Sequence, residues 1–147
     1  MFQKADARID TLSEVSLFRS CSHSELRELA RITTELEAPA GAVLCREGAT
    51  GSDCFVIVDG EARVTIGGDV ITTIGAGGFF GEMALLDGGP RVATVTALSD
   101  MRLLVLSRQE FATLLTTVPS VCRRMLAAIG SRLRLADAQL HPERVGI

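Results

Sequence analysis

Several residue types that carry enzyme chemistry are scarce in this 147-residue chain. Tryptophan and tyrosine are absent, and the two histidines, His23 and His141, stand near opposite ends of the sequence. The four cysteines are scattered without a CxxC pair, at Cys21, Cys45, Cys54 and Cys122. Metal sites need clustered ligands, and nucleophilic catalysis needs a nucleophile beside a base. We therefore expect no metal, no cofactor, no catalytic residues and no enzymatic activity, with free thiols typical of a reducing cytosol.

A basic composition and long apolar runs are also lacking. The formal net charge is −3, whereas proteins that hold nucleic acid present a positive footprint to the phosphates. No run approaches the roughly 18 apolar residues that suggest a membrane-spanning helix. Residues 1–10 contain no apolar stretch typical of a signal peptide. We expect a soluble, cytoplasmic protein that contacts neither nucleic acid directly nor a membrane.

The residues that are present predict one globular domain over 1–147. Hydrophobic residues make up 47% of the chain and charged residues 22%, which is ordinary for a folded protein. The residue pattern changes twice along the sequence, from helical to strand-like and back to helical. We expect an N-terminal helical segment over 1–32, strands over 33–106 and C-terminal helices over 107–140.

Capping residues mark the helices. Ser22 and Glu25 have the spacing of a capping box, Ser107 is a candidate N-cap, and Pro119 suits the first turn of a helix. The predicted helices span 24–32, 108–117 and 119–140, with a further turn or two within 9–18. The last helix carries an apolar stripe that includes Val121 and Leu133.

Between these helices the sequence predicts short strands separated by glycine-rich turns. Ala62, Val64 and Ile66 alternate with polar residues, as in a half-buried strand, and Asp59-Gly60 is a hairpin signal. The predicted strands are 54–58, 62–66, 70–74, 94–97 and 102–106. Short strands at even spacing indicate an antiparallel roll or jelly-roll-like barrel, so the fold class is α+β.

One segment within the strands, residues 80–94 (FGEMALLDGGPRVAT), combines groups suited to a nucleotide. Arg91 offers a guanidinium fork, the side chain best shaped to hold two phosphate oxygens. Glu82 offers a carboxylate, and Gly81 permits close approach to the backbone. The segment resembles the phosphate-binding cassette of cyclic-nucleotide-binding domains. The resemblance extends from about Phe18 to Leu140 and includes the order of roll, cassette between strands, and two C-terminal helices.

The resemblance implies a cyclic nucleotide as ligand and a role for each residue of the cassette. Arg91 would pair with the cyclic phosphate, and Glu82 would accept a hydrogen bond from the ribose 2′-hydroxyl. Gly81, Met83 and Ala84 would act through their backbone, and the amide of Val92 would face the phosphate.

The same resemblance bears on recognition of the base. Val92 stands where some family members have Ser or Thr, whose hydroxyl favours guanine, so we expect cyclic AMP to be preferred over cyclic GMP. Val64 and Thr72 would form the wall beside the purine, although Val64 equally fits an ordinary core position. Arg132 falls where some members place a residue that covers the base, although a solvated charge is an equal alternative.

These features favour a regulatory sensor in which the ligand closes the last helix over the roll. The signal would pass to a partner in trans or to an effector domain outside this sequence. The alternative is a protein-interaction domain that keeps the fold and binds no nucleotide. A transcription regulator is disfavoured, because only seven residues follow Leu140 and leave no room for a helix-turn-helix. The stripe on the last helix could pack on its own roll, on a second copy in a homodimer, or on an effector.

Overall fold

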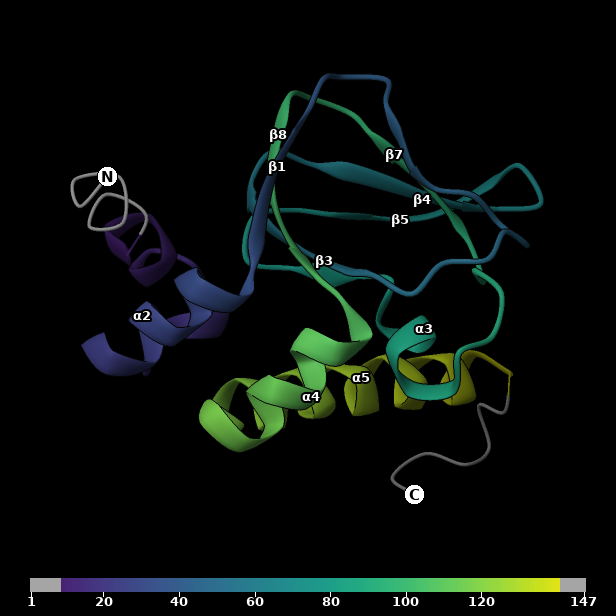
Figure 1. The fold of residues 1–147 in the computed structure, drawn as a ribbon. Coiled ribbons are helices and arrows are strands. Elements are labelled where there is room, and N and C mark those ends of the chain that lie inside the picture. Colours follow the sequence, from purple (N-terminus) through teal and green to yellow (C-terminus); the bar gives the residue numbers. More distant parts are fainter. Residues whose placement is uncertain (1–8, 141–147) are drawn as a thin grey trace.

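The computed structural model describes residues 9–140, in which a β-roll lies above a layer of helices (Figure 1). Residues 9–13 are helical and lead into a 3₁₀ turn, η1 (Ser16–Phe18). The longer helices are α2 (His23–Ile32), α3 (Glu82–Asp87), α4 (Arg108–Thr117) and α5 (Pro119–Leu140). The strands are β1 (Thr34–Ala38), β2 (Val43–Cys45), β3 (Cys54–Asp59), β4 (Ala62–Ile66), β5 (Asp69–Ile74), β6 (Phe79–Phe80), β7 (Thr94–Ala97) and β8 (Met101–Leu106). The predicted α+β roll is confirmed.

The strands form two four-stranded sheets in which every pairing is antiparallel. One sheet has the order β1-β8-β3-β6 and the other β2-β7-β4-β5. The hairpin β4–β5 pairs Val64 with Thr72, and the register shifts at the next residue of β4. Both residues therefore lie at the same level of the second sheet.

Alternation along β8 divides the interior into two apolar clusters. Leu104 and Leu106 belong to a cluster that the first sheet shares with the helices. Met101 and Leu103 belong to a second cluster between the two sheets. The rings of Phe55 and Phe80 are stacked at 5.0 Å in that second cluster. Successive strand residues point to opposite faces, so one strand supports both cores.

Two complete capping boxes fix the starts of α2 and α4. The Ser22 hydroxyl accepts from the Glu25 amide, while the Glu25 carboxylate accepts from the Ser22 amide. Ser107 and Glu110 make the same reciprocal pair. Two amides at each helix start thus gain partners, and both predicted N-caps are confirmed.

Among the residues of α5 whose side chains the structure describes, those in the first part of the helix pack against the core. Val121, Met125 and Ile129 are buried, whereas Leu133 is 61% exposed. Of the predicted apolar stripe, the first part is buried and Leu133 is left exposed, because the helix extends past the apolar cluster. Near its start, Arg124 donates to the carbonyl oxygens of Ser16 and Leu17, which ties α5 to η1.

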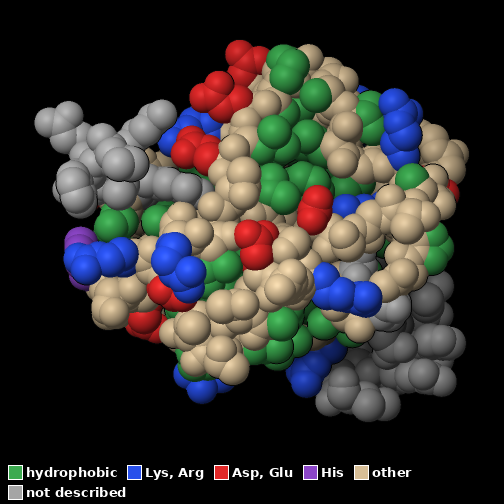
Figure 2. All heavy atoms as spheres, in the orientation of Figure 1, with side chains coloured by type: hydrophobic (Ala, Val, Ile, Leu, Met, Phe, Trp, Pro, Cys, Tyr) green, Lys and Arg blue, Asp and Glu red, His purple; other side chains and the backbone are tan. Residues whose placement is uncertain are grey.

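The surface is mixed in charge. Figure 2 shows hydrophobic side chains gathered over the strands of the roll, with acidic side chains around them. On one sheet, Arg102 forms ion pairs with Glu35 and Asp59. None of the helices within residues 9–140 combines the length and apolar character needed to cross a membrane.

Candidate functional site

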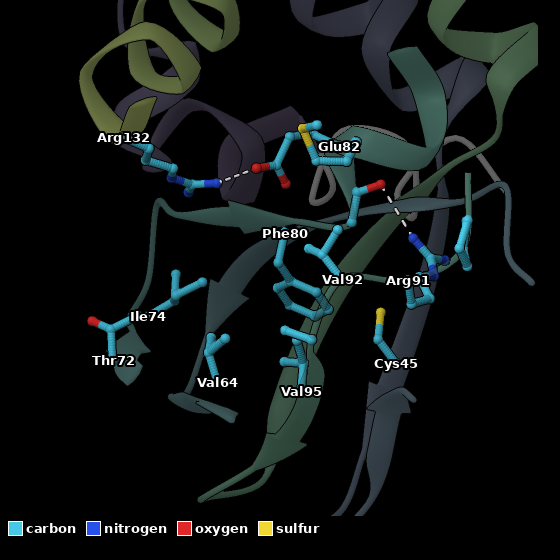
Figure 3. A pocket seen from close by; sticks show the side chains of 14 residues that line it. Cys45, Val64, Thr72, Ile74, Phe80, Glu82, Arg91, Val92, Val95 and Arg132 are labelled. Atoms are coloured by element: carbon cyan, nitrogen blue, oxygen red, sulfur yellow. Dashed lines mark hydrogen bonds and ion pairs between the residues drawn. The ribbon is translucent and has the colours of Figure 1, made fainter. Parts of the chain in front are cut away.

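A cavity of about 180 Å³ opens between the second sheet, the segment around α3, and α5 (Figure 3). Its lining residues are Cys45, Val64, Thr72, Ile74, Phe80, Gly81, Glu82, Met83, Pro90, Arg91, Val92, Ala93, Val95 and Arg132. Most of these side chains are apolar, and the charged groups are Glu82, Arg91 and Arg132. An apolar cavity with a few convergent charged groups is the usual form of a small-ligand site.

Gly81 turns the chain from β6 into α3. Its φ of +82° lies in the left-handed region that glycine adopts without strain. A Cβ at this position would come within 2.7 Å of Arg91 Nη1 and 2.8 Å of the Asp53 carbonyl oxygen. Glycine is therefore required here both by conformation and by space. The turn places Glu82 at the first position of α3, where its side chain lines the cavity.

Arg91 is held by its backbone to the turn that follows β2. Its amide donates to the Ala49 carbonyl and its own carbonyl accepts from the Gly48 amide, both at 2.8 Å. The guanidinium donates to the Gly81 carbonyl at 3.2 Å and lies 6.0 Å from the centre of the Phe55 ring. No carboxylate whose side chain the structure describes forms an ion pair with Arg91. The fork therefore has donors available for an anion in the cavity.

Glu82 forms an ion pair with Arg132 of α5. Arg132 Nη1 lies 2.6 Å from Glu82 Oε1, and Nη2 donates to the Phe79 carbonyl at 2.8 Å. The guanidinium also lies 4.5 Å from the centre of the Phe79 ring, within the range of a cation–π contact. The Glu82 side chain is 12% exposed and that of Arg132 40%. Figure 3 shows Arg132 approaching Glu82 from α5.

The other residues predicted from the sequence lie around the same cavity. Val64 and Thr72 line it from the paired strands β4 and β5, and Val92 lies next to Arg91 with 61% of its surface exposed. Met83 lines the cavity, and Ala84 lies on α3. The structure thus brings the start of the cassette, at Gly81 and Glu82, close to Arg91 near its end. The wall formed by β4 and β5 and the side chain of Arg132 complete the same cavity.

Sequence reasoning missed several of the lining and supporting residues. Lining positions to which the sequence analysis assigned no role are Cys45, Ile74, Phe80, Pro90, Ala93 and Val95, of which Phe80, Pro90 and Ala93 lie within the predicted cassette. Ile74 and Val95 lie on strands that were predicted, so alternation along those strands could have indicated them. No local sequence pattern indicates the role of Phe79, because its contact with Arg132 joins residues 53 positions apart.

The lining of the cavity includes one thiol, that of Cys45. Burial raises the pKa of the Cys45 thiol above its ordinary value, with the nearby Arg91 acting in the opposite direction. The thiol is therefore a neutral part of the wall at neutral pH. Within the described residues, no group of three or more His, Cys, Asp or Glu side chains is placed to hold a metal ion.

The sequence also matches the model of a known protein family. The model of the cyclic nucleotide-binding domain matches residues 35–118. This range covers more than half of the chain and includes the cassette. The protein therefore belongs to the cyclic nucleotide-binding domain family, a class of regulatory domains.

Individual relatives carry the same domain in longer proteins. A cyclic nucleotide-gated potassium channel of Rhizobium etli is 41% identical over 110 residues, which are 75% of this chain and 31% of the channel. The cyclic AMP receptor protein of Thermus thermophilus is 34% identical over 107 residues, which are 69% of this chain and 50% of the receptor. The chain thus spans at most half the length of either relative.

A solved structure covers almost the whole chain. A cyclic nucleotide-binding domain from Methylobacillus flagellatus aligns with a TM-score of 0.75 at 27% identity, covering 99% of this chain and 86% of that domain. The similarity includes the roll and the C-terminal helices.

Proposed function

We propose that the cavity binds a cyclic nucleotide, with cyclic AMP preferred over cyclic GMP. The observation that carries the proposal is the Arg91 guanidinium, which lines the cavity and lacks a described carboxylate partner. In the proposed complex Arg91 holds the cyclic phosphate and Glu82 accepts from the ribose 2′-hydroxyl. The backbone of Gly81, Met83, Ala84 and Val92 lies along the ribose and phosphate.

The base lies against Val64 and Thr72 in this arrangement. Val92 supplies no hydroxyl to the guanine amino group, which supports the preference for adenine. The name of the Thermus thermophilus relative, a cyclic AMP receptor, is consistent with this preference.

Binding is coupled to α5 because Arg132 closes one side of the cavity. Ligand cavities commonly measure about 300–1,000 Å³, so the cavity of about 180 Å³ is small for a nucleotide, and we expect its walls to shift when the ligand binds. The ligand then selects the arrangement of α5 in which it makes the most contacts. The signal passes through α5 to a partner in trans, to a second copy, or to an effector domain.

Calorimetric titration of cyclic AMP and cyclic GMP into the purified chain and into Arg91→Ala tests the proposal. Two charge-assisted hydrogen bonds of about 1.5 kcal/mol each correspond to roughly a 100-fold affinity, so we expect Arg91→Ala to lose at least that much. Arg19→Ala removes the same charge at an exposed position outside the cavity and serves as control.

The two possible failures have different meanings. A folded wild-type chain that binds neither nucleotide would contradict the proposal and favour the protein-interaction domain. Binding that Arg91→Ala leaves intact would place the nucleotide somewhere other than this cavity. Cyclic GMP binding as tightly as cyclic AMP would refute only the stated preference.

A further inference from the structure

The Glu82 carboxylate is a buried charge whose position depends on a distant residue. The residue is 9% exposed, and a carboxylate with so little access to water requires a charged or hydrogen-bonding partner. Within the described chain, the partner of its side chain is Arg132, which follows it by 50 positions. Glu82 is therefore oriented from α5 as well as from its own turn.

Arg132 is itself fixed from more than one direction. Its Nη1 contacts Glu82, its Nη2 donates to the Phe79 carbonyl, and its plane lies close to the Phe79 ring. Two donors of one planar fork are thus engaged by groups three positions apart, at the start of β6 and the start of α3. Such a fork has a defined direction, which a lysine ammonium lacks.

The contact engages one oxygen of the carboxylate. The ion pair involves Oε1, and the second oxygen of Glu82 points away from Arg132 in Figure 3. A carboxylate has lone pairs on both oxygens, and no donor within the described residues contacts Oε2, so this oxygen can accept a hydrogen bond.

We propose that Arg132 is a positioning residue that sets the ribose selectivity of the pocket through Glu82. By holding Oε1, it directs Oε2 to accept from the 2′-hydroxyl of the nucleotide. This inference rests on the proposed function, and it gives α5 a role at the ribose instead of at the base. Without Arg132 the Glu82 carboxylate loses its countercharge and turns toward water, and the ribose hydroxyl loses its acceptor.

The ratio of affinities for cyclic AMP and 2′-deoxy cyclic AMP tests this role. A hydrogen bond to a charged group corresponds to roughly a tenfold or larger preference, which we expect in the wild-type chain. In Arg132→Ala the ratio falls toward one, mainly because cyclic AMP binds more weakly. Arg132→Lys recovers part of the ratio, because it returns the charge without the fork.

Two further variants serve as comparisons for Arg132→Ala. Arg134→Ala removes an exposed arginine from the same helix and keeps the wild-type ratio. Glu82→Gln lowers the ratio as Arg132→Ala does, and adding Arg132→Ala to it produces little further change in the ratio. Circular dichroism and thermal melting of each variant verify the fold, and Arg132→Lys provides the test if Arg132→Ala does not fold.

Three outcomes separate the hypotheses. A ratio that falls in Arg132→Ala and not in Arg134→Ala supports the positioning role. An Arg132→Ala variant that loses affinity for both ligands equally overturns it and indicates a general contact with the nucleotide, while the proposed function stands. A wild-type chain that binds neither ligand overturns both.

Discussion

At the scale of single residues, the position of the Arg91 guanidinium depends on the absence of a side chain at Gly51. A Cβ built there would lie 2.5 Å from Arg91 Nε, and the backbone of Gly51 is outside the left-handed region. We therefore expect Gly51→Ala to fold normally and to displace the guanidinium. Loss of one charge-assisted hydrogen bond predicts about a tenfold weaker affinity for cyclic AMP, measured by titration.

Gly75→Ala is the matched control for this change. A Cβ at Gly75 meets no atom within 4 Å, and its backbone is likewise outside the left-handed region. Both substitutions reduce the freedom of the unfolded chain to a similar degree. If the two variants bound cyclic AMP equally well, the proposed restriction at Gly51 would be wrong.

The residues of the cassette were accessible to sequence reasoning because Gly81, Glu82 and Arg91 lie within one short segment. The partner of Glu82 was not, since an ion pair across 50 positions depends on how α5 crosses the roll. The sequence marked Arg132 as a candidate near the base. Its contact with Glu82 became visible only with the packing of α5.

At the scale of elements, the two capping boxes fix where helices begin. Replacing Ser22 or Ser107 by alanine removes one side-chain acceptor from the N3 amide. We expect each change to lower the free energy of unfolding by about 1 kcal/mol. Urea denaturation provides the measurement. Ser24→Ala, at an exposed position inside α2, is the control and should be neutral or slightly stabilising.

The contribution of the first box also depends on pH. Hydrogen bonding from the Ser22 amide is the main cause that lowers the pKa of Glu25 below its ordinary value. A carboxylate with a depressed pKa in the folded state stabilises the protein at neutral pH. This stabilisation is lost as the pH falls below the ordinary glutamate pKa and through the lower pKa of the folded state. The loss of unfolding free energy in Glu25→Ala, which removes the carboxylate that accepts from the Ser22 amide, should therefore shrink in acid, and a loss that grows would contradict the assignment.

Elements with strong local signals were predicted, and those defined by pairing were not. Strand β4 and helix α4 have the predicted bounds because alternation and a capping serine mark them. Strand β6 has two residues, and it exists as a strand only because Phe79 and Phe80 pair with β3. The three-residue β2 contains a register shift against β7, which no local pattern reveals.

At the scale of the whole molecule, the cavity joins parts of the structure that pack in separate cores. The second sheet and Phe80 belong to the cluster between the sheets, whereas α5 and Phe79 belong to the cluster beneath the first sheet. Arg132 and Glu82 connect these two parts across the cavity. A ligand that contacts both sides would therefore stabilise the packing of the helices on the roll.

This arrangement predicts that cyclic AMP raises the melting temperature of the whole domain. A ligand present at 100 times its dissociation constant contributes about 2.7 kcal/mol, which corresponds to a rise of roughly 5–10 °C for a domain of this size. Thermal melting at increasing nucleotide concentration provides the measurement. Arg91→Ala should show almost no rise in melting temperature at the same concentrations, because it lacks the guanidinium that binds the phosphate. An equal rise in this variant would mean that the nucleotide stabilises the protein from another site, and that the link across the cavity is not the path of stabilisation.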